Sequence, residues 1–399
     1  MKREILAVRR CLDFICRHML TGNNGKHGMY ERFMTDTKER SVCVRPDCNA
    51  EAARVLWKLR QSGETDDLAM LYENIVEWLL KAQRKGGDGL PVGTFPFYLV
   101  DGIGCDESLS NYLYQNDNGK VLVAMADLYN LAGDKRMEEP MRLAADFWTQ
   151  LQQPDGVFYR QGVPGLQAAC KGPVFSIWLA LGLLLCGEYF HVPAYTEAAR
   201  RSFARLDTML LDTGRIQTTY EVEGGEAWRP ASSESAIALY CYTRAYELTK
   251  DREYFRKASQ LAEFLRGLQS YQGGIVNCNT ACLEASQQNN EDLCDLVYTQ
   301  GYALMGLARF ARLEDSYGEC VRRLADFLMD IQCQGESSLW DGAWRGAYSI
   351  SEKRWSGRAD QGGNLLDEGG MYAIYTGWCC MPIAEGLLDT LGLAGGKRQ

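Results

Sequence analysis

A repeated pattern constrains the fold of this 399-residue chain more than any other feature. Six times, an amphipathic run with helical spacing ends at a polar stop, and a glycine and an aromatic or apolar residue follow. The turn glycines lie 61, 67, 58, 60 and 68 residues apart, and they are Gly28, Gly89, Gly156, Gly214, Gly274 and Gly342. Self-similarity at this period indicates an architecture built from one repeated supersecondary unit.

The third copy, LQQPDGVFYR at 151–160, shows what each copy contributes. Pro154, Asp155 and Gly156 form a turn through their ordinary backbone preferences. We expect Gln152 to tie this turn by hydrogen bonds and Phe158 to pack between neighbouring hairpins. Asp155 is then a structural residue rather than a catalytic one.

Each copy is followed by a long segment and a second helical run that is apolar on nearly all sides. These second runs are 51–63, 119–134, 174–190, 232–251, 298–315 and 375–389. A helix that is apolar all round is buried, whereas the first runs keep a polar face. Six hairpins with one helix inside and one outside predict an all-α fold, a closed (α/α)6 toroid. We expect one domain over 1–399, with 391–399 as a flexible tail.

The long connections precede the buried helices, so a closed toroid places all of them on one rim. They cover 34–50, 99–118, 160–173, 217–231, 277–297 and 347–374. Long loops on a rigid scaffold commonly carry function, and helix N-termini favour anionic groups. The functional site is therefore expected on this rim.

Charge and composition exclude several classes of function. The net charge is −9 and basic residues do not cluster, so nucleic acid is not the expected partner. The longest apolar run, 174–186, is too short to span a bilayer, and the N-terminus lacks the apolar core of a secretory signal. We expect a cytoplasmic protein without membrane association. The 15 cysteines are scattered and only three histidines occur, which favours buried thiols over a metal site, and no cofactor is predicted.

Carboxylates are concentrated in the predicted rim loops, directly before the buried helices. Four of them are the candidate catalytic residues: Asp47, Asp117, Glu234 and Asp295. Acids that converge from different sides of a ring suit hydrolysis of a glycosidic bond, in which one carboxyl protonates the leaving oxygen and another activates water. Each acid alone also fits a helix cap or a first-turn residue that complements the helix dipole. The whole set around one rim indicates catalysis.

Aromatic and arginine side chains share these segments. Flat aromatics stack on sugar faces, although they also pack loops together. The planar guanidinium of arginine pairs with carboxylates, either of a substrate or of the protein itself. The predicted substrate-binding residues are Tyr114, Tyr220, Trp228, Arg229, Trp344, Arg358 and Trp378. The expected partner is an oligosaccharide, and the oligomeric state stays open.

The chain resembles the six-hairpin glycosidase superfamily in its six αα-hairpins, its acidic rim and the motif ADLYNLAGD at 126–134. Within that superfamily it is most similar to the unsaturated glucuronyl and rhamnogalacturonyl hydrolases, which carry an Asp-Asn at the start of a buried helix, as Asp117-Asn118 stands here. The resemblance implies that Asp117 protonates the enol-ether double bond of an unsaturated uronic acid and activates water. It further implies an assisting acid, either Asp47 or Asp106.

Two departures from that family widen the expected specificity. Ser233, Glu234 and Ser235 stand where the family places a Gln or Arg and a Trp that face the sugar, and no histidine lies on a late loop. We therefore expect a glycoside hydrolase that acts on oligosaccharides, including those with uronic acids. Asp117 would act in it together with Glu234 or Asp295.

Other proteins built on α/α toroids are the alternatives. A polysaccharide lyase would use a tyrosine base, Tyr220 or Tyr372. A terpene cyclase matches the Gln, Gly and aromatic of the repeat and the acidic EDLCD at 291–295, but no Asp-x-Asp-Asp motif occurs. Epimerases of the same superfamily need histidines on late buried helices, which this chain lacks. A non-catalytic binding toroid would pair its rim acids with arginines.

Overall fold

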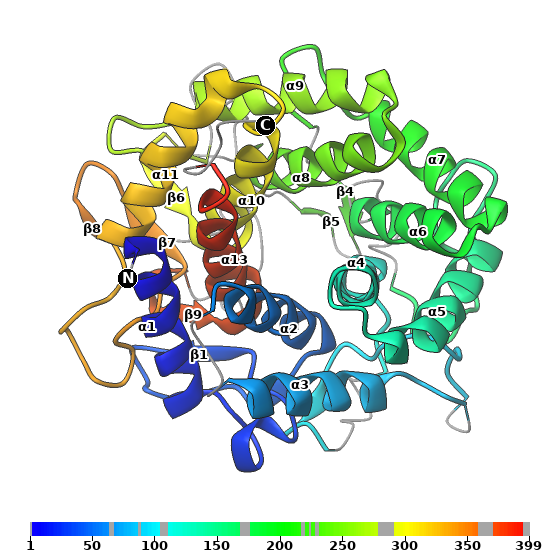
Figure 1. Cartoon of the computed structure of the whole chain (residues 1–399), viewed down its shortest axis with the longest axis horizontal. Helices are drawn as coiled ribbons and strands as arrows, with labels where there is room; N and C mark the ends of the chain where they lie inside the picture. The colour runs from blue at the N-terminus through cyan, green and yellow to red at the C-terminus, as the bar shows by residue number, and fades with distance from the viewer. Residues whose placement is uncertain are drawn as a thin grey trace.

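Two concentric rings of helices form the molecule (Figure 1). The computed structural model describes residues 2–63, 68–86, 89–103, 111–167, 176–216, 220–222, 225–227, 231–277, 291–357 and 370–393. The inner helices are α2 (Pro46–Gln61), α4 (Gln115–Leu131), α6 (Ile177–Phe190), α8 (Ala231–Thr249), α10 (Gly301–Phe310) and α13 (Met381–Thr390). The outer helices are α1 (Arg3–His18), α3 (Ala69–Ala82), α5 (Glu138–Leu151), α7 (Pro193–Asp207), α9 (Arg252–Gly267) and α11 (Gly318–Asp330). The all-α (α/α)6 toroid predicted from the repeat is confirmed.

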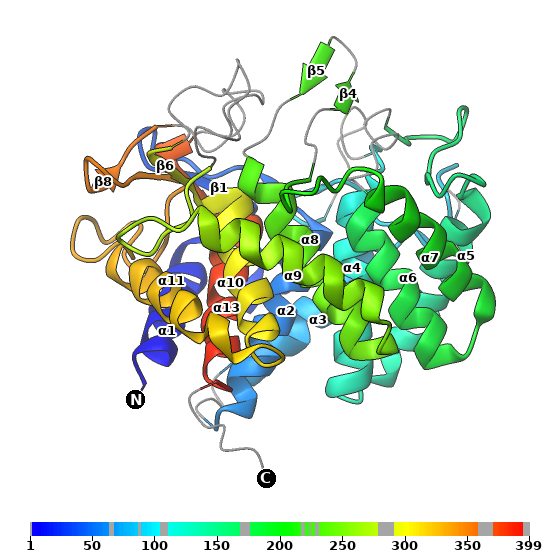
Figure 2. The ribbon, with the colours of Figure 1, turned by 90° about the horizontal axis from the view of Figure 1, so that it is seen from above.

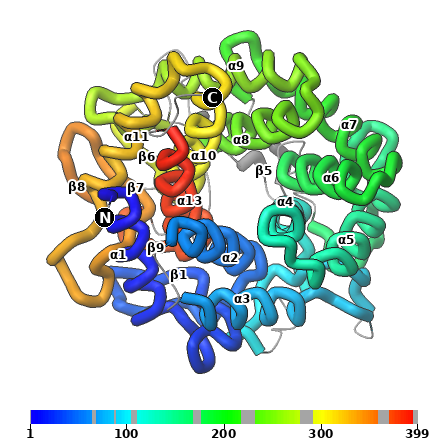
Figure 3. Tube along the Cα trace, viewed as in Figure 1, coloured from blue at the N-terminus to red at the C-terminus, as the bar shows by residue number. Residues whose placement is uncertain are grey.

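The ring closes between the first and last hairpins. The chain travels once around it, so the blue N-terminal and red C-terminal segments lie side by side (Figure 3). Each inner helix packs on two others, in the order α2, α4, α6, α8, α10, α13 and back to α2. Gln332 Nε2 donates to the carbonyl of Ala7 in α1 and to that of Gly342, each at 2.8 Å. On the loop side, β1 (Arg32–Met34) pairs antiparallel with β9 (Ala373–Tyr375). Closure leaves no open end of a solenoid to be capped.

In four of the six copies, a glutamine joins the turn to the next hairpin. Gln152 Nε2 donates to the carbonyl of Gly156 in its own turn (3.2 Å) and to that of Ala198 in the next outer helix (2.8 Å). The same pair of bonds recurs in three further copies, at Gln83, Gln269 and Gln332. The role expected for Gln152 is confirmed.

Phe158 and Asp155 are also structural residues of the third turn, and the contact shown for Phe158 is with α5 of its own hairpin. Phe158 is fully buried and meets Trp148 edge-on, with ring centroids 6.3 Å apart. Asp155 accepts the backbone N–H of Val157 at 3.2 Å, which stabilises the turn. The stretch is thus a structural joint between hairpins.

The turn glycines are required because the next outer helix approaches closely. Gly156 has a φ of +89°, and a Cβ there would lie 2.4 Å from the carbonyl oxygen of Arg201 in α7. The same approach to a backbone carbonyl recurs at Gly93, Gly214, Gly273 and Gly342. No side chain fits these positions without displacing a neighbouring helix.

Three of the glycines assigned from the sequence are wrong for this role. In the first copy, the atoms nearest to a Cβ at Gly28 belong to side chains, with Val44 Cγ1 at 2.7 Å, and not to a backbone carbonyl. In the second copy the approach is made by Gly93 rather than Gly89, around which a Cβ would meet nothing within 4 Å. In the fifth copy the residue with positive φ is Gly273 (+106°) rather than Gly274. Two glycines lie close together in these last two segments, and only the packing of the next hairpin distinguishes them.

Replacing Gly156 with alanine is expected to destabilise the protein by more than the equivalent change at Gly162. Both glycines have similar positive φ, but a Cβ at Gly162 meets nothing within 4 Å. The left-handed conformation costs an alanine about 1–2 kcal/mol at either site, and the overlap with Arg201 adds about 1–3 kcal/mol at Gly156 alone. Urea denaturation of the two variants measures the difference, and equal losses would contradict the close approach.

Two inner helices begin earlier than the sequence predicted. α2 starts at Pro46 rather than 51, and α4 starts at Gln115 rather than 119. A proline suits the first position of a helix because its φ is already helical and its missing N–H is not needed there. Asp47 and Asp117 consequently lie inside first helical turns and not in loops.

Short strands and two π-helices cover the rim at the N-terminal ends of the inner helices. Figure 2 shows the strands on one side of the molecule and both termini on the other. The further antiparallel pairs join β2 (Cys43–Val44) to β3 (Leu99–Val100), β4 (Tyr220–Val222) to β5 (Gly225–Ala227), and β7 (Ala347–Ser349) to β6 (Leu293–Asp295) and β8 (Arg354–Trp355). The π-helices Leu296–Gln300 and Thr376–Cys380 lead into α10 and α13. In the part of the chain that is described, no helix has the length and apolar character needed to cross a bilayer.

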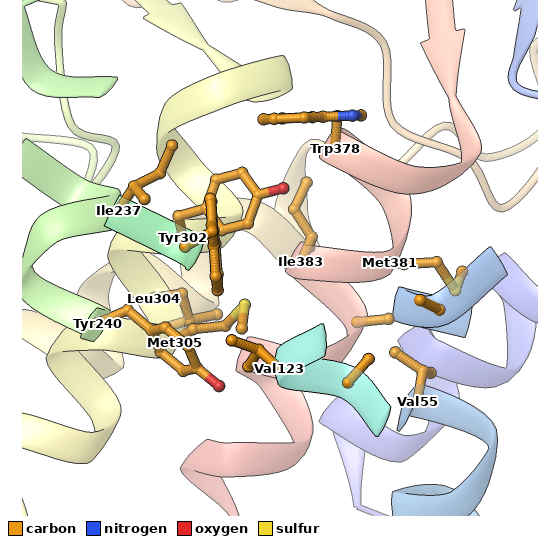
Figure 4. Close-up of a cluster of buried hydrophobic side chains, with 14 of the residues drawn as sticks. Val55, Val123, Ile237, Tyr240, Tyr302, Leu304, Met305, Trp378, Met381 and Ile383 are labelled. Carbon is orange, nitrogen blue, oxygen red and sulfur yellow. The ribbon is translucent and has the colours of Figure 1, made fainter. Parts of the chain in front are cut away.

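The inside of the inner ring is filled in layers. Figure 4 shows the middle layer, an apolar cluster that includes Val55 and Val123, both fully buried. Trp378 and Tyr302 border this layer towards the rim and bond to carboxylates there. Tyr240 borders it on the other side, where its hydroxyl accepts hydrogen bonds from Arg54 and Arg244. These two arginines belong to a second ionic cluster, distinct from the charged groups at the rim, which also contains Lys58, Asp127, Glu385 and Asp389. Two charged layers are therefore separated by apolar side chains.

Candidate active site

The candidate active site is built on the first turns of α2 and α4, which are neighbours in the inner ring. Arg45 directly precedes α2 in extended conformation, and its guanidinium lies between the two acids. Its Nε is 3.1 Å from Asp47 Oδ1, and its Nη2 is 2.8 Å from Asp117 Oδ2. Two of the predicted catalytic residues thus share one arginine.

Arg45 has a third carboxylate and an aromatic ring beside it. Its Nη1 donates to Glu31 Oε1 at 2.8 Å, so each of its nitrogen groups bonds to a carboxylate. The guanidinium carbon lies 4.4 Å from the centroid of the Phe97 ring, and that ring is 5.1 Å from the ring of Tyr114. The predicted binding residue Tyr114 therefore stands at the edge of this cluster.

A buried lysine lies beneath Asp47. Lys120 Nζ is 3.3 Å from Asp47 Oδ2 and 2.9 Å from Glu51 Oε1, and its side chain is almost wholly buried. Lys120 follows Asp117 by three residues in α4, and Glu51 follows Asp47 by four in α2. These spacings place each pair on one helix face, and the two faces meet.

Trp378 forms the floor of the cluster. Its indole N–H donates to Asp47 Oδ2 at 2.6 Å and its backbone N–H to Glu51 Oε2 at 2.9 Å. Lys120 Nζ lies 3.4 Å from the centroid of one of its rings. The residue has a φ of +52°, a conformation that bulky residues adopt only where the surroundings impose it. Trp378 was predicted to stack on substrate; at 6% exposure its visible role is to hold two carboxylates.

Burial and neighbouring charges give Asp117, Asp47 and Glu51 different pKa values. Burial raises the pKa of Asp117 to about 7; the charge of Asp47 adds to the rise, while Arg45 and Lys120 oppose it. Burial acts in the same direction on Asp47, but Arg45, Lys120 and the hydrogen bonds hold its pKa below the ordinary value. Burial also raises the pKa of Glu51, against the attraction of Lys120. Near neutral pH the cluster therefore pairs a charged Asp47 with an Asp117 that is partly protonated.

The other two predicted catalytic acids lie on later inner segments. Glu234 is in the first turn of α8 and is 8% exposed. Asp295 is fully buried and caps the π-helix before α10. Its carboxylate accepts the N–H of Val297 at 2.9 Å and the hydroxyl of Thr299 at 3.1 Å. These bonds give Asp295 a structural task.

Of the remaining residues predicted to bind substrate, Trp344 is buried in the protein interior, and for the others the structure describes no side chain. Trp344 is fully buried, and its indole N–H donates to the carbonyl of Leu328 at 2.7 Å. Tyr220 is in β4, but its side chain is not among those described. Three further residues predicted to bind substrate, and one assisting acid, lie outside the described residues: Trp228, Arg229, Arg358 and Asp106.

Sequence reasoning did not single out four residues of the cluster, which are Glu31, Glu51, Phe97 and Lys120. A signal existed for Lys120, because a lysine in a helix that is apolar on all sides is buried and needs a carboxylate partner. The spacing of Glu51 after Asp47 places it on the same face. Glu31 and Phe97 lie in loops, where no periodicity reveals which way a side chain points.

The described residues bring together no group of three or more His, Cys, Asp or Glu side chains suited to a metal ion. The charged groups around Asp117 are balanced by arginine and lysine instead.

Comparison with known proteins supports the fold of this chain. No protein-family model and no curated protein matches the sequence. Solved structures match over almost the full length at low identity. A cellobiose 2-epimerase from Bacillus thermoamylovorans has a TM-score of 0.71 at 8% identity, covering 98% of this chain and 99% of that one.

Two other matching structures are described as an epimerase and as a hydrolase. A sugar epimerase from a ruminal bacterium has a TM-score of 0.69 at 10% identity, over 99% of this chain and 100% of that one. An unsaturated glucuronyl hydrolase specific for heparin has a TM-score of 0.65 at 13% identity, over 98% of each chain. These neighbours are members of the six-hairpin glycosidase superfamily. The resemblance inferred from the sequence is thereby confirmed at the level of the fold.

Proposed function

We propose that the protein is a sugar-processing enzyme, and specifically a glycoside hydrolase in which Asp117 is the general acid. The observation that carries the proposal is the state of Asp117: it is in the first turn of an inner helix on the loop rim, buried, and has a pKa of about 7. A carboxyl group that keeps its proton near neutral pH is what donation to a glycosidic oxygen needs. The sugar-acting names of the structural neighbours support the broader class.

The other residues of the cluster have supporting roles in this mechanism. Arg45 fixes the carboxyl of Asp117 by a hydrogen bond at 2.8 Å, and the charged Asp47 beside it disfavours loss of the proton. When the glycosidic bond breaks, the proton of Asp117 passes to the leaving oxygen, and water adds to the anomeric carbon. A second carboxylate has to accept a proton from that water. We assign this task to Glu234, which is in the first turn of the inner helix α8 on the same rim.

Asp295 and Asp47 are not assigned the base role. The carboxylate of Asp295 caps a helix, and Asp47 is fully buried under Arg45, Lys120 and Trp378. Neither position offers a place for water between the carboxylate and a sugar.

The positions of the histidines favour a hydrolase over an epimerase. His18 ends α1, His27 lies in the loop after it, and His191 follows α6 at the end opposite the rim. None of them is on α8, α10 or α13. An enzyme that relied on late buried histidines would lack its acid and base here.

The charges of the cluster favour a neutral sugar in the position next to Asp117. Arg45 bonds to three carboxylates, and Lys120 bonds to two. Both cations of the cluster already bond to carboxylates, so a uronic acid would need a cation from outside the cluster, for which Arg229 and Arg358 are candidates. Neutral oligosaccharides are therefore the first substrates to test.

A panel of neutral and uronic-acid oligosaccharides tests the proposal. Release of reducing sugar from any member supports a hydrolase, and loss of the ultraviolet absorbance of unsaturated uronides identifies the hydration mechanism. Appearance of that absorbance identifies a lyase. A new epimer without bond cleavage identifies an epimerase. Either of the last two results would overturn the proposed function.

The pH dependence of the reaction follows from the proton on Asp117. If Asp117 donates a proton, kcat/KM is expected to fall above pH 7, by about tenfold per pH unit, because the active form is the protonated one. If it acted as a base, the rate would instead rise through pH 7. Initial rates between pH 5 and pH 9 on one substrate distinguish the two signs.

A further inference from the structure

We propose that Lys120 is a positioning residue that sets the pH at which Asp117 loses its proton, acting through its buried charge and not by contact with substrate. The inference concerns Asp117 as a proton donor and so rests on the proposed function. Lys120 does not reach the rim surface, since its side chain is 1% exposed. It follows Asp117 by three residues on α4, so its charge acts on that carboxyl across one helical turn.

The contacts of Lys120 are specific and come from two other inner segments. Its ammonium group lies 3.3 Å from Asp47 Oδ2 and 2.9 Å from Glu51 Oε1, both on α2. It also lies 3.4 Å from a ring centroid of Trp378, which leads into α13. A buried lysine costs several kcal/mol of desolvation unless it is fully paired, and these partners offset that cost.

Asp47 connects Lys120 to Asp117. One of its oxygens, Oδ2, forms an ion pair with Lys120 Nζ and accepts hydrogen bonds from the indole N–H of Trp378 and from one N–H of Arg45. The other, Oδ1, receives Arg45 Nε, and Arg45 bonds in turn to Asp117. Lys120 therefore helps to keep Asp47 charged; the charge of Asp47 raises the pKa of Asp117, whereas the charge of Lys120 itself lowers it.

All the charged groups of the described residues that face this chain of contacts can be named. Arg45 and Lys120 are the cations, and Glu31, Asp47, Glu51 and Asp117 are the acids. The hydroxyl of Tyr302 on α10 donates to Glu51 Oε1 at 2.7 Å. Removing one of only two cations from a cluster with four acids should make every proton in it harder to remove.

The test is the Lys120→Met variant, followed by two measurements. The first is the carboxyl carbon resonance of Asp117 in protein labelled with ¹³C-aspartate, assigned by its loss in Asp117→Asn and titrated without substrate. The second is the pH profile of kcat/KM. We expect both midpoints to move to higher pH by about one unit relative to the wild type.

Lys58→Met is the matched control. Lys58 is also on an inner helix and bridges two carboxylates, Glu385 at 2.8 Å and Asp389 at 2.6 Å, but beyond the apolar middle layer. It should lower stability without moving either midpoint. If Lys120→Met only lowers stability in the same way, Lys120 has no positioning role and the inference is overturned.

A second variant keeps the test decisive if Lys120→Met fails to fold. Glu51→Gln removes one acid from the cluster and leaves the charge of Lys120 less compensated, so the two midpoints are expected to move to lower pH. No shift, or an alkaline one, would contradict the inference. The carboxyl titration needs no substrate, so a shifted titration without glycan cleavage would overturn the proposed function and leave the role of Lys120 standing.

Discussion

Asp117→Asn is expected to reduce kcat by about 10²–10⁴-fold, the usual contribution of a positioned general acid. Asparagine keeps the shape of the side chain but has no proton to donate. The folded protein should remain at least as stable near pH 7 as the wild type. Burial raises the pKa of Asp117 from its ordinary 3.8 to about 7, so its ionisation weakens the wild type progressively as the pH rises between these two values.

Asp155→Asn is the matched control for this variant. It makes the same chemical change in a turn of the third copy, where the side chain is half exposed, accepts a backbone N–H and lies 3.7 Å from the partly exposed Arg205. It should keep wild-type kcat. Full activity in Asp117→Asn would remove Asp117 from the mechanism, whereas loss of activity in both variants would point to a general disturbance of the fold. Thermal unfolding of each variant at pH 5 and pH 8 completes the comparison.

Arg54→Met is expected to cost about 3 kcal/mol of folding free energy, the lower end of the range for breaking a buried ion pair. Arg54 belongs to the second ionic cluster and is 3% exposed. It contacts Glu385, lies 3.3 Å from Asp127 Oδ2 and donates to the hydroxyl of Tyr240 at 2.7 Å. The loss stays at the lower end because both acids keep another cation, Lys58 for the first and Arg244 for the second.

Arg3→Met is the control on the surface. Arg3 also contacts two acids, Asp326 and Asp330, but its side chain is 53% exposed. Exposed ion pairs contribute about 0–1 kcal/mol, so this variant should lose little. Guanidinium chloride denaturation measures both free energies. Since the apolar layer separates Arg54 from the rim, kcat of the folded Arg54→Met protein should be unchanged; a large loss of kcat would contradict that separation.

The repeat made the fold predictable. Apolar periodicity distinguishes buried helices such as α6 from half-exposed ones such as α5, and six copies in sequence admit few arrangements other than a closed ring. The task of Gln152 was predictable for the same reason, because a turn that recurs has to join equivalent helices. Helix starts were less certain. Pro46 and Gln115 begin their helices earlier than the apolar pattern suggests. The first turns of these helices contain polar residues, and a pattern of apolar residues does not detect them.

The site was predictable in part. Asp47 and Asp117 could be nominated because acids before buried helices converge on a toroid's rim, and the structure does bring them together around Arg45. Trp344 shows the limit of this reasoning, because a tryptophan in a rim loop can equally be buried in the wall between hairpins.

The ring, the rim and the residue types on the rim follow from the sequence alone, because periodicity and residue type can be read directly along the chain. Folding in three dimensions adds the positions of Lys120 and Trp378 under Asp47, the place of Glu31 among the partners of Arg45, and the pKa of Asp117 near 7. Those outcomes depend on distances of a few ångströms between segments remote in sequence. Coulombic and desolvation energies vary steeply over such distances, and no sequence pattern encodes them.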